Sequence, residues 1–372
     1  MQRNPILKPL TLALAAVLFA AGAQAATRHK QPKPAKTPPA AASSAAAAAN
    51  APSPAEQARV KALIQYQHDL VSVLALRGDA VHLIGAALLA LPLPNPSEGL
   101  SFHDLSERAA KAPAAGPGIT WIRMSDCDGK GVACPNPDMY AALQKQASDN
   151  AAVWMLAMDE AAQKGDAAGQ RAALAKAAAA KTYDDYFGIG LQGTANAAGT
   201  LPPLPDTMTG TQAGEPTTAL GVEVLIAFGV ANQHPRPSLK PLLDLCSADN
   251  AGKDDALKSD CLKAAHAMEW GSSPIARAVG LHIRGELKPE DKAATDRDSR
   301  NLAWQLQNYG VIGVRALNDD KLAQPLLTAA RSGGTELSLM LSSLRANGIP
   351  TEAPDGWQPA QPPAASSAGA GG

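Results

Sequence analysis

The sequence is poor in aromatic residues and has almost no net charge. Phe, Trp and Tyr make up 4% of its 372 residues, and 33 Lys and Arg residues are balanced by 34 Asp and Glu residues. The balance hides an asymmetry, because residues 1–55 hold six of the basic residues and none of the acidic ones. The rest of the chain therefore carries about seven net negative charges, which argues against a protein that binds nucleic acid through basic surface.

The chain also lacks the short motifs of common enzyme classes. It contains no Gly-x-Ser-x-Gly elbow, no His-Glu-x-x-His motif, no Walker loop and no dinucleotide fingerprint. Clear alternation of apolar and polar residues is missing as well, so no β-rich region is expected. We expect no cofactor and no metal, leave the catalytic residues unassigned, and regard an enzyme as the less favoured class.

The first 25 residues have the features of an export signal. A basic start precedes an apolar stretch over residues 10–21, and Ala23-Gln24-Ala25 fits the small-x-small pattern of a cleavage site. The apolar stretch is shorter than the roughly 20 residues that span a bilayer, so a retained anchor is the weaker alternative. We expect cleavage after Ala25, no membrane span in the cleaved chain, and a periplasmic or secreted location.

Both ends of the cleaved chain have low sequence complexity. Residues 26–54 are rich in Pro, Ala, Ser and Lys, and residues 351–372 are rich in Pro, Ala and Gly. Such segments cannot bury a core, so we expect a disordered tether before the body and a disordered tail after it. For Trp357 in the tail, folding back onto the body and simple exposure both remain open.

The four cysteines form two sequence-local groups, Cys127 with Cys134 and Cys246 with Cys261. An even count in an exported chain predicts disulfides, and of the three possible connectivities we favour the two local pairs. Each would stabilise the fold by about 2.5 to 3 kcal/mol. A metal site or a redox pair is less favoured, because neither spacing is Cys-x-x-Cys and no histidines cluster nearby.

Between the tails the apolar residues recur at helical spacing. Residues 55–76 and 81–91 predict one helical hairpin, and residues 149–164 and 167–181 predict another, joined at Gly165-Asp166. Further helices are expected over residues 217–230, 239–246, 254–270, from 273 onward, 291–317, 321–329 and 336–346.

A Gly-, Pro- and Thr-rich segment over residues 188–215 predicts a long loop that serves as a domain boundary or a lid. We therefore expect an all-α fold of stacked antiparallel hairpins. It would comprise an N-terminal region of hairpins over residues 55–200 and a C-terminal helical region over residues 201–350.

One of these windows, Asn150 to Ala177, resembles a degenerate tetratricopeptide repeat. Trp154 stands at the Trp position of the repeat, Gly165-Asp166 follows at an eleven-residue offset, and Leu174 and Ala177 occupy its apolar and small positions. A later window resembles the related Sel1-like repeat through Ala264-Ala265, Gly271, Ala276, Val279-Gly280, Ile283, Gly285 and Ala303-Trp304. The overall layout also resembles uncharacterised exported bacterial envelope proteins. The repeat resemblance implies an α-solenoid that binds a protein or peptide.

The candidate binding residues form an aromatic and acidic cluster after a predicted helix. Tyr183, Asp184, Asp185, Tyr186 and Phe187 are suited to bind a peptide or a glycan, although a helix-ending cap packed against its neighbour is the favoured alternative. His266 and Glu269 lie three residues apart on a predicted helix, either as a base with its partner or as an ordinary surface pair.

Two other sets of residues are best explained by structural roles. Trp154, Trp270 and Trp304 occur at helical spacing among apolar residues and are interpreted as packing residues. Asp126-Cys127-Asp128-Gly129 resembles the start of a calcium loop, but a turn closed by Cys127 and Cys134 explains it better.

The sequence thus favours an exported helical-repeat protein that serves as a binding or scaffolding module, with an unidentified protein or peptide partner in the cell envelope. The alternative is an all-helical enzyme acting on peptidoglycan or another envelope glycan. Glu107, Asp159 and Glu160 are nominally available as its acids, but nothing in the sequence pairs them. A deep cleft with convergent carboxylates would favour the enzyme, and a shallow groove would favour the binding module.

Overall fold

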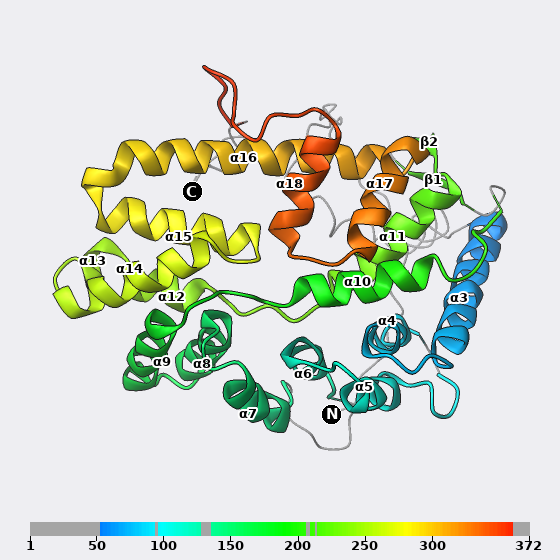
Figure 1. Cartoon of the computed structure of the whole chain (residues 1–372), viewed down its shortest axis with the longest axis horizontal. Coiled ribbons are helices and arrows are strands. Elements are labelled where there is room, and N and C mark those ends of the chain that lie inside the picture. The colour runs from blue at the N-terminus through cyan, green and yellow to red at the C-terminus, as the bar shows by residue number, and fades with distance from the viewer. Residues whose placement is uncertain (1–52, 94–95, 128–134, 206–208, 213, 360–372) are drawn as a thin grey trace, which may run out of the picture. The chain divides into compact units, whose positions relative to one another are not determined.

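The computed structural model describes residues 53–93, 96–127, 135–205, 209–212 and 214–359. These residues are helical nearly throughout, and their strands form one short antiparallel pair, β1 (Thr211–Gln212) and β2 (Glu215–Pro216) (Figure 1). The predicted all-α class is confirmed. The predicted signal peptide, residues 26–52 of the tether and residues 360–372 of the tail lie outside the described residues. No helix in the described part is both long and apolar enough to cross a membrane.

The chain divides into two compact units, and each is assembled from separate stretches of sequence. The first unit comprises Met1–Gly131, Ile189–His234 and Gly313–Gly333, and the second comprises Val132–Gly188, Pro235–Ile312 and Gly334–Gly372. This division differs from the contiguous regions expected on either side of residue 200. The reason is that α10 (Phe187–Ala198) and α16 (Lys292–Arg315) each begin in the second unit and end in the first.

The first unit is built around α4 and α11, which are buried on most of their surface. Its helices are α3 (Pro54–Leu74), α4 (Ala80–Ala90), α5 (Phe102–Lys111), α6 (Pro117–Arg123), α11 (Ala219–Ala231) and α17 (Asp320–Arg331), together with most of α10. The predicted hairpin at Gly78-Asp79 is present, and the Asp79 side chain caps α4 by accepting from the His82 amide at 3.0 Å. An Asp side chain at this position accepts a hydrogen bond from a backbone amide that has no partner within the first turn of the helix.

The segment predicted as a long loop begins with helix α10, so the prediction is wrong over residues 188–198. Glycine normally weakens a helix, but here it permits a close crossing of α10 and α4. A Cβ built on Gly85 would lie 2.3 Å from the carbonyl oxygen of Gly193, and one built on Gly193 would lie 2.9 Å from the Gly85 amide nitrogen. The glycines are therefore a packing signal rather than a loop signal.

The second unit contains two helical hairpins packed against each other. Its elements are α7 (Pro137–Gln146), α8 (Ala151–Gln163), α9 (Ala167–Ala179), α12 (Lys240–Leu245), α13 (Ala248–Ala251), α14 (Asp255–Glu269), α15 (Pro274–Leu287), η2 (Pro289–Asp291) and α18 (Glu336–Ala346), together with most of α16. Helices α8 and α9 form one hairpin, α14 and α15 form the other, and α9 packs on α14 (Figure 1). This is the repeat-like stacking expected from the sequence. The two hairpins are not consecutive in the chain, because residues 180–254 lie between the end of α9 and the start of α14.

The turn of the first of these hairpins matches its prediction residue by residue. Gly165 adopts a left-handed backbone with φ of 67°, and Asp166 caps α9 by accepting from the Gly169 amide at 2.8 Å. Trp154, Leu174 and Ala177 are buried. Glycine tolerates this conformation because it has no Cβ, so the Gly-Asp pair both ends one helix and starts the next.

The beginning of the predicted tail packs against α16. The indole of Trp357 meets that of Trp304 edge to face, with ring centroids 5.3 Å apart, and Gln305 donates to the Thr351 carbonyl at 2.7 Å. The Ala353 amide also donates to the Asn301 side chain. Residues 351–359 are therefore ordered, and of the two alternatives for Trp357 the structure shows the one in which it folds back.

Candidate functional site

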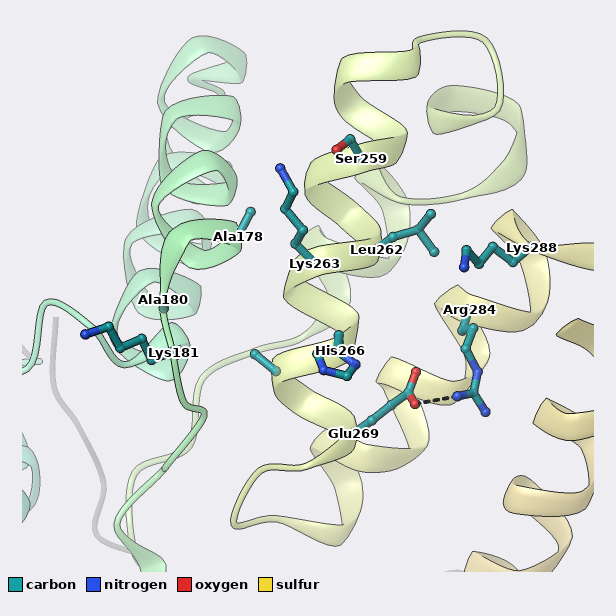
Figure 2. Close-up of a pocket in the computed structure, with 11 residues that line it drawn as sticks. Ala178, Ala180, Lys181, Ser259, Leu262, Lys263, His266, Glu269, Arg284 and Lys288 are labelled. Atoms are coloured by element: carbon teal, nitrogen blue, oxygen red, sulfur yellow. Dashed lines mark hydrogen bonds and ion pairs between the residues drawn. The ribbon is translucent and has the colours of Figure 1, made fainter.

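A groove of about 500 Å³ lies in the second unit, where the end of α9 meets α14 and α15 (Figure 2). Helix α14 runs through its middle and contributes more of the lining than any other element. The lining residues are Ala178, Ala180, Lys181, Ser259, Leu262, Lys263, His266, Ala267, Glu269, Arg284 and Lys288. This volume lies within the usual range for small-ligand sites, about 300 to 1,000 Å³.

The amphipathic sequence of α14 presents one polar face to the groove. Asp254 starts the helix by accepting from the Leu257 amide at 2.9 Å. Ser259, Lys263 and His266 then follow at spacings of four and three, which places them on the same side of a helix. The opposite face is buried and consists of Leu257, Cys261, Ala264, Ala265 and Met268.

Two features hold this helix in place. Cys261 is bonded to Cys246 at the end of α12, with Cα atoms 5.6 Å apart, in the pairing that the sequence favours. Gly280 of α15 lies so close to α14 that a Cβ there would be 2.6 Å from the Ala265 carbonyl oxygen. The small residues that suggested the Sel1-like repeat therefore permit close helix packing. Cys127 is also disulfide-bonded, whereas Cys134 lies outside the described residues.

One end of the groove is closed by a saturated ion cluster around Arg284. Its guanidinium donates to Glu269 at 2.8 Å, to Asp298 at 2.7 Å and to the Thr295 hydroxyl at 3.0 Å. Glu269 is only 6% exposed; burial raises the pKa of this carboxyl, and the charge of Arg284 opposes that rise. Because each member is engaged, the cluster is a structural support for the groove wall.

The remaining charged groups of the lining are basic. Lys263 rises from α14 toward α9, and the ammonium of Lys288 is directed toward Leu262, whereas that of Lys181 at the groove edge is directed away from α14 (Figure 2). Among the described residues, Lys181 and Lys263 have no ion-pair partner. Lys288 has a partly exposed partner, Asp291, at 3.5 Å. The groove is thus locally positive on a body whose overall charge is negative.

The groove holds no arrangement for nucleophilic catalysis. Ser259 and His266 are separated by two helical turns, about 10 Å along the axis, which is too far for a direct hydrogen bond. The carboxylate of Glu269 accepts from Arg284, and these two described residues, Glu269 and His266, form no hydrogen bond with each other (Figure 2). What the lining can do is hold a ligand that carries negative charge and some apolar surface.

The predicted cluster at Tyr183 to Phe187 is mostly packed inside the second unit. Tyr183, Asp185 and Phe187 are each less than 5% exposed, and the Ser272 hydroxyl donates to Asp185 at 3.3 Å. Asn150 exchanges hydrogen bonds with the backbone of Asp184, which fixes the segment to the start of α8. This burial favours the helix-ending cap over a surface anchor and leaves Asp184 and Tyr186 partly exposed.

Trp270 is not a packing residue, so the sequence interpretation of it is wrong. It directly follows Glu269 at the end of α14 and is 76% exposed. The next residue, Gly271, contacts Tyr183 so closely that a Cβ would lie 2.8 Å from the Tyr183 carbonyl oxygen. This contact brings the backbone next to Trp270 close to Tyr183, two residues after Lys181, although Trp270 itself is not among the lining residues.

The acids considered for an enzyme are each bonded to a side chain four residues further along the chain. Glu107 of the first unit pairs with Lys111 at 2.6 Å, whereas Asp159 and Glu160 lie on α8 of the second unit and bond to Gln163 and Lys164. In the calcium-like sequence, Asp126 is buried and lies 2.9 Å from a ring nitrogen of His103, while Asp128 and Gly129 are outside the described residues. Within the described part of the chain no three His, Cys, Asp or Glu residues are grouped to hold a metal ion.

The sequence did not reveal the groove itself. Lys263 and His266 could be placed on one helix face from their spacing, but Lys181 and Lys288 come from other elements. Comparison of the chain with protein-family models, with curated proteins and with solved structures gave no match. The resemblance to helical repeats therefore rests on the residues quoted above and on the observed hairpin packing.

Proposed function

We propose that this chain is an exported helical-repeat protein that serves as a binding or scaffolding module in the bacterial periplasm, and that it holds its protein or peptide partner in the groove beside α14. The export signal and the paired cysteines support the compartment. The stacked hairpins support the relation to tetratricopeptide and Sel1-like repeats.

The observation that carries the proposal is the composition of the groove wall. It presents basic and apolar side chains to solvent, and its one carboxylate is engaged by Arg284. A positive groove on a negatively charged body favours association with an oppositely charged partner. The alternative, an enzyme acting on a glycan, needs two converging carboxylates, and the three acids considered for it are each bonded to the residue four positions further along the chain.

Site-specific photocrosslinking in the native cells tests this proposal. A photoreactive residue replaces exposed Ser259 in the groove, and a matched variant carries it at Lys145, which is exposed on α7 and does not line the groove. We expect a reproducible protein adduct from position 259 and none from position 145. Equal labelling at both positions, or no adduct at either together with turnover of an envelope glycan by the purified protein, would overturn the proposal.

A further inference from the structure

The groove lining differs from the usual lining of a sugar-binding site. Sugar hydroxyls require acceptors as well as donors, and these are commonly supplied by carboxylates and amides. Here the lining contains no Asn or Gln, and the carboxylate of Glu269 already accepts from Arg284. The available polar groups of the wall are ammonium donors, a hydroxyl and an imidazole, which suit an anion better than a neutral polyol.

The lining of the groove also contains apolar side chains beside the basic ones. Leu262 and three alanines contribute to the wall. The exposed indole of Trp270 belongs to the residue that directly follows Glu269 of the wall. Exposed tryptophan is unusual on a surface with few aromatic residues and is typical of binding anchors. A purely ionic ligand such as free phosphate would leave this apolar surface uncovered.

The length of the polar face sets the size of the ligand. From Ser259 on this face to Trp270, which directly follows the last residue of α14, the rise is about 16 Å, at about 1.5 Å per residue. An extended peptide covers that distance with about five residues. The backbone groups of α9, α14 and α15 are largely bonded within their own helices, so the occupant is held by side chains rather than by strand pairing.

The geometry points to a linear acidic segment of a partner protein as the occupant of this groove, with its carboxylates against Lys263 and Lys288 and an apolar side chain against Trp270. This inference rests on the proposed function and specifies the chemistry of its partner. Lys181, at the groove edge, adds to the positive potential without a direct contact being required.

Peptide binding to the purified full chain tests the inference. The probe is a blocked, dye-labelled peptide of about seven residues, with one leucine flanked by glutamates, and its control has glutamine in place of every glutamate. Fluorescence anisotropy should detect binding of the glutamate peptide and no binding of the glutamine peptide. The affinity for the glutamate peptide should fall as the salt concentration is raised, because the charges involved are partly exposed.

Matched variants locate the binding. Lys263→Glu should weaken binding of the glutamate peptide about tenfold, since it replaces an attraction with a repulsion, whereas Lys145→Glu makes the same charge change outside the groove and should have little effect. Trp270→Ala should weaken binding about fivefold through loss of the apolar contact. Circular dichroism of each variant establishes that it is folded.

Three results would overturn the inference. The first is equal binding of the glutamate and glutamine peptides, and the second is equal loss in the Lys263→Glu and Lys145→Glu variants. The third is tighter binding of tetragalacturonate, an acidic sugar without an apolar side chain, than of the glutamate peptide. In each case an adduct at position 259 and none at position 145 would leave the proposed binding function standing, whereas equal labelling at both positions would remove both.

Discussion

The two units use their helices in different ways. Helix α4 of the first unit is apolar apart from His82 and almost fully buried, and it approaches α10 through glycine. Helix α14 of the second unit buries one face and exposes Ser259, Lys263 and His266 on the other. A helix that is hydrophobic all round is buried on all sides by other elements, whereas an amphipathic helix keeps one face exposed, where a partner can bind. The comparison explains why the candidate site is found in the second unit.

The largest expected effect comes from breaking the buried ion pair of the first unit. Arg331 donates to Glu223 at 2.7 Å and to the Ala195 carbonyl at 3.0 Å, and Glu223 is 5% exposed. Arg331→Met should lower the free energy of unfolding at pH 7 by roughly 3 to 5 kcal/mol, because it leaves a buried carboxylate without its partner. Urea unfolding monitored by circular dichroism measures the change.

The pH dependence of that variant gives a second check. Burial holds the pKa of Glu223 above its usual value, Arg331 opposes the shift, and removal of Arg331 raises the pKa further. A raised carboxyl pKa means that the folded state binds the proton more tightly, so the loss should be small near pH 4 and should grow as the pH rises. The double variant Glu223→Gln with Arg331→Met should recover much of the stability at pH 7; no recovery would contradict this account.

In the second unit the Cys246–Cys261 disulfide is a covalent constraint on α14. Replacing both cysteines with alanine should lower the free energy of unfolding by about 3 kcal/mol, because the link closes a loop of 15 residues. The same change should loosen α14 and therefore the groove. Hydrogen exchange of residues 255–269 should accelerate in the variant, and unchanged exchange there would argue against the disulfide as the support of the site.

The close approach of α4 and α10 at Gly85 and Gly193 predicts a further loss of stability on substitution. Gly85→Leu should lower the free energy of unfolding by about 1 to 3 kcal/mol, since its Cβ would meet the Gly193 carbonyl and force α4 and α10 apart. Gly78→Leu is the matched control, because a Cβ at Gly78 meets nothing within 4 Å. Similar unfolding midpoints for the two variants would refute the role assigned to the close crossing.

The smallest effect is expected at the C-terminal segment of the second unit. Trp357→Ala removes the edge-to-face contact with Trp304 and should lower the free energy of unfolding by about 1 kcal/mol. It should also make residues 351–359 more accessible to protease. Wild-type resistance in this segment after the substitution would show that the bonds of Thr351 and Ala353 hold it without the indole.

Local sequence was sufficient for most helices and for their turns. The hairpin of α8 and α9 followed from apolar spacing, from Gly165 and from the Asp166 cap, all of which act within a few residues. The same local rules misassigned α10, because its glycines are explained by a neighbour distant in the sequence. They also misassigned Trp270, whose helical spacing predicted burial although it lies beyond the last turn of α14.

The sequence by itself determined the all-helical class, the hairpin turns, the favoured Cys246–Cys261 pairing and the polar face of α14, because each depends on residues that are close in the chain. Only the tertiary structure decided how residues 132–188 and 235–312 combine into one unit, and hence that Lys263 and Lys288 share a groove with the end of α9. It also decided that Glu269 is buried and accepts from Arg284. Such outcomes depend on long-range packing, which helical periodicity does not encode.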